Sequence, residues 1–102
     1  MESIKRLAEH IECELDAAEK YLLDAEKEAM LFPEIAKGYY AQSLAKMDAV
    51  KQLHDIAVIV IENYRKEKGE PPAPMMVIYD YLHEKHMKQA AQIKALQSMF
   101  KL

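Results

Sequence analysis

The sequence has few of the residues on which small folds other than helical bundles depend. It contains one cysteine, Cys13, together with two glycines, four prolines and no tryptophan. One cysteine excludes an intrachain disulfide. The longest apolar run, residues 56–61, is far shorter than the ~20 residues that a membrane-spanning helix needs. The first residues read directly into a helical pattern without the apolar core of a secretion signal. We therefore expect a reduced, cytoplasmic protein that does not enter membranes.

A strong excess of charge of one sign is also missing. Fourteen basic and 17 acidic residues give a net charge of −3, and lysine alternates with glutamate along the chain. Proteins that bind nucleic acids usually concentrate basic residues on one face, because neutralising phosphates provides most of their affinity. The chain has neither a glycine-rich phosphate loop nor a serine or cysteine in a context that would activate it. We expect neither nucleic-acid binding nor catalysis.

What the sequence does contain is typical of an all-α bundle. Apolar residues make up 51% of the chain and charged residues 30%. Apolar side chains recur at spacings of three and four along residues 3–31, 33–68 and 74–100, which predicts three long helices. Pro33 suits a helix start, and Gly69 with the prolines after it suits a helix end. Short connections favour antiparallel packing, so we predict one domain spanning residues 1–102.

The second predicted helix carries a segment that is apolar on every side, residues 56–61. A helix that is apolar all round needs neighbours all round, and two flanking helices leave one side free. Tyrosine and lysine stems could cover that side, or a second chain could. We favour self-association, and we expect Ile56, Ile59, Val60 and Ile61 to lie at the interface.

Two stretches, ENYRKEKGEPP at residues 62–72 and YDYLHEKH at residues 79–86, resemble small uncharacterised helical proteins encoded by bacteriophages and prophages. This resemblance covers most of the chain. Its motifs are not catalytic signatures, so it implies a helical fold and no particular activity.

Glu14, Ala17 and Tyr21 resemble the first-helix pattern of the ferritin-like and rubrerythrin-like group, whose glutamate binds metal. The resemblance implies a helical bundle with a carboxylate and histidine site for iron, manganese or zinc. The second helix of that group carries Glu-x-x-His. This sequence instead has Lys46 with Ala49, or Asp48 with Lys51. The implied metal site is therefore degenerate.

Hairpin geometry brings polar residues of the three predicted helices toward one layer. Lys51 falls level with Glu14, while His54 falls about one turn from both Glu14 and His86. One reading is a hydrogen-bonded layer that fixes helix register, with a buried Glu14–Lys51 ion pair, His54 nearby and no stoichiometric metal. The other is a transition-metal site made by Glu14, His54 and His86.

His83 lies three residues before His86 and could add a ligand to such a site, although its charged neighbours also suit a solvated helix face. We therefore predict a non-enzymatic, self-associating structural or interaction protein without a cofactor. Such a module could also dock a protein partner, whose identity the sequence does not indicate. The alternative is a ferritin-like protein that binds a transition metal.

Overall fold

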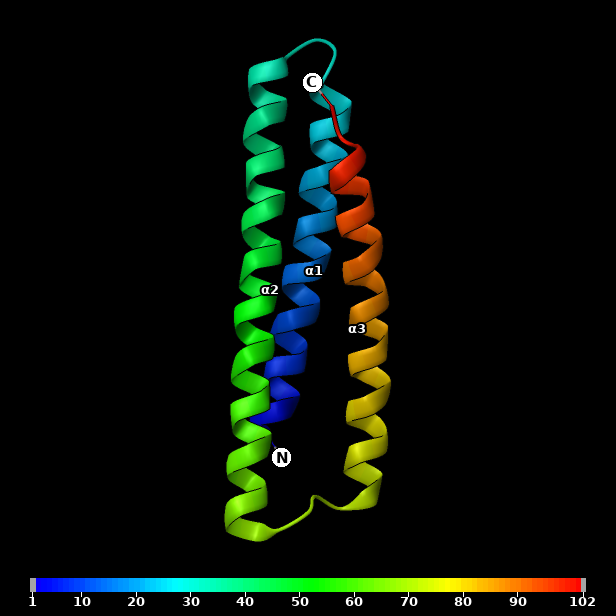
Figure 1. The fold of residues 1–102 in the computed structure, drawn as a ribbon. Coiled ribbons are helices and arrows are strands. Elements are labelled where there is room, and N and C mark those ends of the chain that lie inside the picture. The colour runs from blue at the N-terminus through cyan, green and yellow to red at the C-terminus, as the bar shows by residue number, and fades with distance from the viewer. Residues whose placement is uncertain (1, 102) are drawn as a thin grey trace.

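The computed structural model describes residues 2–101, which form a rod of three antiparallel helices (Figure 1). These helices are α1 (Glu2–Glu28), α2 (Pro33–Lys68) and α3 (Ala73–Met99). The rod measures 56 × 18 × 18 Å. The described residues include no strand, so the predicted all-α, three-helix fold is confirmed.

The helix ends follow from local sequence. α1 stops at Glu28, three residues before the predicted Leu31, and the N–H of Phe32 donates to the Glu28 carbonyl over 2.8 Å. Pro33 then opens α2, where its missing N–H leaves no hydrogen bond unmade. Gly69 ends α2 with a φ of 78°, and its N–H donates to the Arg65 carbonyl over 3.0 Å. That left-handed φ favours glycine, because any larger residue would be strained there.

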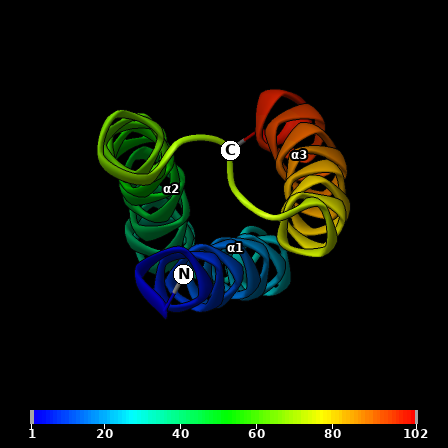
Figure 2. The ribbon, with the colours of Figure 1, turned by 90° about the horizontal axis from the view of Figure 1, so that it is seen from below.

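The three helices do not share their contacts equally. α1 packs most extensively on α2 and less on α3, while α2 and α3 touch each other least. Seen along the rod, the ribbons form an arc that is closed on the α1 side and wide between α2 and α3 (Figure 2). α3 is therefore the helix that packs least extensively on the other two.

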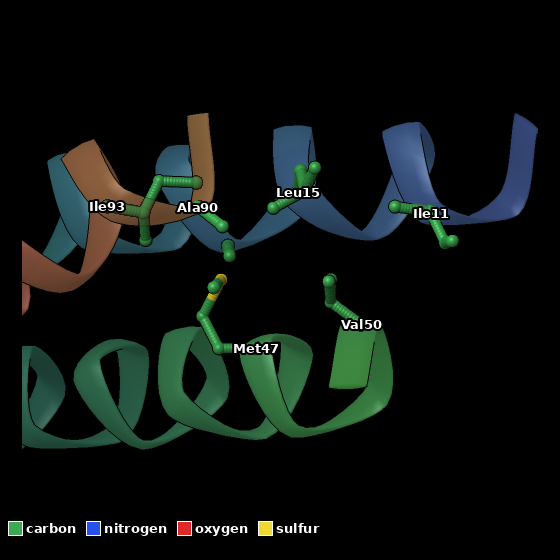
Figure 3. Close-up of a cluster of buried hydrophobic side chains, with 7 residues drawn as sticks. Ile11, Leu15, Met47, Val50, Ala90 and Ile93 are labelled. Atoms are coloured by element: carbon green, nitrogen blue, oxygen red, sulfur yellow. The ribbon is translucent and has the colours of Figure 1, made fainter. Parts of the chain in front are cut away.

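The core lies where all three helices meet. Figure 3 shows Ile11 and Leu15 of α1 facing Met47 and Val50 of α2, with Ile93 of α3 alongside. Leu15 and Ile93 are almost completely excluded from solvent. Burying each such side chain stabilises the fold by roughly 1.5–3 kcal/mol relative to exposure.

A second cluster, toward the N-terminus of α1, joins Ile4 to Ala57 and Ile61. Leu7, Val60 and Tyr79 pack against it and stay partly exposed. The two clusters lie along the apolar stripes that the spacing of the sequence predicts. Within residues 2–101, no helix combines the length and the apolar character of a transmembrane segment.

Candidate functional site

The polar contacts that cross the core centre on Ser43, which is completely buried. Its hydroxyl donates to the Ala18 carbonyl over 2.7 Å and accepts a hydrogen bond from Gln97 Nε2 over 2.9 Å. Tyr40 donates from its hydroxyl to the Gln97 carbonyl over 3.1 Å and stacks on Phe100. These contacts join residues of all three helices in a single network, two of them from α2. They hold the C-terminal part of α3 against the α1–α2 hairpin.

The sequence-based prediction placed the polar layer elsewhere and missed this network. The signal was present, because Ser43 falls on the buried stripe of Ala36, Met47 and Val50, and Gln97 continues the stripe of Ala90 and Ile93. A serine in such a stripe can bond within a neighbouring helix, and a glutamine facing it supplies the donor.

The predicted layer of Glu14, Lys51 and His54 is not formed, which corrects that expectation. Lys51 is exposed, and the cation beside Glu14 is Lys46, whose Nζ lies 3.3 Å from Glu14 Oε2. The lysine of the ion pair is therefore one and a half turns nearer the start of α2 than hairpin symmetry suggested. The geometry is that of an ion pair without a hydrogen bond, and Glu14 Oε2 has no hydrogen-bond partner among the described residues.

The three candidate histidines are brought together, but Glu14 is not among them. His54, His83 and His86 line one small cavity of about 20 Å³ between the helices. Glu14 lines a separate hollow on the α1–α2 surface. No group of three or more His, Cys, Asp or Glu side chains within residues 2–101 is arranged to hold a metal ion. The set Glu14, His54 and His86 thus does not converge on one point.

The solvent-facing side of α2 is the part of the helix that neither neighbour covers. It carries a row of uncharged residues at alternating spacings of three and four, which we call the outer row: Gln42, Ala45, Ala49, Gln52, Ile56, Ile59 and Asn63. The spacing is that of a helix seam that packs against another helix. Ile56 is 46% exposed and Ile59 56% exposed.

Of the four predicted interface residues, two face solvent. Ile61 is 7% exposed and belongs to the chain's own core, which corrects its assignment to an interface. Val60 is half-buried against the same core cluster. The misassignment arises because an all-round apolar segment contains residues of both faces, and only packing separates them.

A hollow of about 370 Å³ lies beside the outer row. Its α2 side is formed by Ala49, Gln52, Leu53 and Ile56, and its α1 side by His10 and Glu14. Small and apolar side chains of α2 thus meet a polar edge of α1. Such a hollow leaves room for side chains of another helix against the outer row.

A larger groove of about 440 Å³ lies between the N-terminal parts of α1 and α3. Its floor is apolar, with Ile4, Ile61, Tyr79 and Leu82 among its residues. Its α1 rim alternates in charge, with Lys5 between Glu2 and Glu9. Glu12 also lines the groove, so acidic side chains outnumber the one lysine on this side.

No family model, curated protein or solved structure matches this chain. The resemblances to phage-encoded helical proteins and to the ferritin-like group stay predictions.

Proposed function

We propose that the chain is a helical interaction module that self-associates side by side through the outer row of α2. The observation that carries this proposal is the exposure of Ile56 and Ile59 in a row whose seven residues include no charged side chain. Large apolar side chains that lie side by side and exposed mark a candidate protein–protein contact. The heptad spacing of the row suits a second helix as the partner.

The surface area of the monomer supports the same proposal. The chain exposes 7002 Å². A compact protein of 11.8 kDa exposes about 5,900 Å² by the usual scaling of area with mass. The excess of about 1,100 Å² is similar to the ~800 Å² that each partner contributes to a standard interface. Lateral pairing of two rods would remove such an excess most directly.

The expected affinity is modest. A symmetric pair would cover four half-exposed isoleucines, which together contribute roughly 3–6 kcal/mol. Association itself costs on the order of 4–15 kcal/mol. Other side chains, such as Ala49 of the outer row and Leu53 beside it, must therefore add to the contact. We expect a dimer, or a larger assembly, whose population depends on concentration.

Sedimentation velocity over a range of micromolar concentrations tests the proposal. The wild-type chain should shift from monomer toward a dimer or larger species as concentration rises. Ile59→Glu should abolish this shift, because a carboxylate in the outer row would have to lose its water in the contact. Ile78→Glu is a matched control, since Ile78 is a similarly exposed isoleucine on α3, outside the outer row.

A wild-type protein that stays monomeric at several hundred micromolar would refute the proposal. Equal loss of association in Ile59→Glu and Ile78→Glu would place the contact on a different surface. Circular dichroism of both variants distinguishes loss of association from loss of the fold.

A further inference from the structure

Three of the four histidines gather in the interior, at the level where the N-terminal half of α3 meets the other helices. We call His54, His83 and His86 the histidine cluster. The His54 and His83 rings lie 5.1 Å apart between centroids, and His83 stacks on Tyr79 at 5.9 Å. The small cavity that the three histidines share is also lined by Tyr79 and by apolar residues of α1 and α3: Ile4, Ala8, Ile11 and Leu82.

His86 is the innermost member of the cluster. It is 3% exposed, and its Nε2 atom is buried without a hydrogen-bond partner among the described residues. A neutral imidazole tolerates one unpaired nitrogen, but an imidazolium has two N–H donors to satisfy. Burial is the main reason that the pKa of His86 is lowered from its ordinary value.

The charged and titratable groups around His86 come from all three helices. α1 contributes Glu12 and Asp16, whose charges raise the pKa of His86 and so partly offset the effect of burial. Glu12 is engaged by Lys85 over 2.9 Å, and Asp16 accepts a hydrogen bond from Gln89 over 2.9 Å.

The other surrounding groups oppose a positive charge or are neutral partners in the packing. On α3, Lys85 and His83 lower the pKa of His86, and Tyr79 lines the shared cavity. α2 contributes His54. A proton on His86 is thus opposed mainly by burial, and in addition by Lys85 and His83, while Glu12 and Asp16 offset this opposition only in part.

We propose that the histidine cluster is a pH-sensitive latch, which packs the N-terminal half of α3 against α1 and α2 when neutral and releases it when protonated. α3 has the least support of the three helices, so local opening is easiest there. Its C-terminal half is held separately by the hydrogen bonds of Gln97 to Ser43 and Tyr40. Release would expose the apolar floor of the 440 Å³ groove, including Ile4 and Ile61.

The direction of the pH effect follows from linkage. In the released state His86 regains an ordinary pKa of about 6.5, so that state binds a proton more readily than the docked state. The docked state of α3 therefore has its full stability at pH values above the ordinary pKa of about 6.5. Its stability falls as the pH drops through about 6.5. The stability stops falling once the pH is below the lowered pKa of docked His86.

Hydrogen exchange of backbone amides, followed by NMR at pH 7.5 and pH 5.5 and corrected for intrinsic rates, tests the latch on the wild-type chain. Amides of residues 78–90 should lose protection by up to about tenfold, because a site with an ordinary pKa of about 6.5 can favour the released state by no more than that at pH 5.5. Amides in the centres of α1 and α2 should keep theirs. The ring resonances of His86 should titrate over the same pH range.

Matched variants distinguish protonation of the histidine cluster from a general effect of low pH on the fold. His86→Gln removes the titrating group, so the additional loss of protection at pH 5.5 should disappear. His10→Gln makes the same change at the exposed histidine of α1, and the loss should remain. If His86→Gln fails to fold, the wild-type exchange and ring titration still decide the question.

Three results would overturn the latch. One is equal loss of protection in all three helices. Another is titration of His86 without any change in the exchange of α3. The third is the same pH-dependent loss in His86→Gln as in the wild-type chain.

Discussion

At the scale of single residues, Ser43 connects all three helices through one hydroxyl group. Ser43→Ala would leave Gln97 Nε2 buried without its acceptor, which costs about 1–3 kcal/mol of unfolding free energy. Urea denaturation measures this cost. Ser98→Ala is the control, because the Ser98 hydroxyl bonds to the Ala95 carbonyl on an exposed surface and should contribute little. Equal effects of the two changes would contradict the role assigned to Ser43.

Lys46, rather than Lys51, supplies the positive charge next to Glu14. About a third of the Lys46 side chain and a quarter of Glu14 are exposed, at 33% and 27%, so solvent screens the pair in part. We expect Lys46→Met to cost about 1 kcal/mol, measured by urea denaturation. Lys51→Met changes an exposed side chain and should stay within about 0.5 kcal/mol of the wild type. A larger effect of Lys51→Met than of Lys46→Met would contradict the structure.

At the scale of helices, the two glycines have opposite roles. Gly69 ends α2 with a positive φ, whereas Gly38 lies inside α2, exposed and with nothing near the position of an added Cβ. Gly69→Ala should therefore destabilise the fold by about 1 kcal/mol or more through backbone strain. Gly38→Ala should stabilise it by about 0.5–1 kcal/mol through helix propensity. Thermal melts at low protein concentration measure both, and effects of the same sign would refute this account of the helix ends.

α2 also has a buried face and an exposed face, and both carry apolar residues. Residues such as Val50 and Ile61 pack into the bundle, while Ile56 and Ile59 of the outer row face solvent. Because both faces are apolar in the segment 56–61, the segment cannot be assigned as a whole to core or interface. The division follows from the direction in which each side chain leaves the helix.

At the scale of the whole molecule, association through the outer row should appear in the thermal stability. A state that binds a second copy is stabilised by mass action, so the melting temperature should rise with protein concentration. Ile59→Glu should melt at a temperature that is independent of concentration, whereas Ile78→Glu should keep the dependence. Differential scanning calorimetry over a hundredfold concentration range measures this. A wild-type melting temperature that does not change would contradict self-association.

The sequence by itself determined the number of helices, their type and nearly all of their ends. Apolar spacing is local and periodic, and Pro33 and Gly69 act on their own backbone, so no knowledge of distant residues is needed. It also indicated that His54 and His86 approach one another, because hairpin symmetry gives levels along the rod.

Only the tertiary structure decided which polar groups meet. Hairpin symmetry about Phe32 predicts that Lys51 lies level with Glu14, but α1 already ends at Glu28, so the turn is centred earlier and Lys46 lies beside Glu14 while Lys51 is exposed. The periodic pattern also does not specify which buried side chains bond to each other, as in the network of Ser43 and Gln97, which joins residues 54 positions apart through a contact of 2.9 Å. A hydrogen bond needs agreement within a few tenths of an ångström, whereas a periodic pattern specifies only a face.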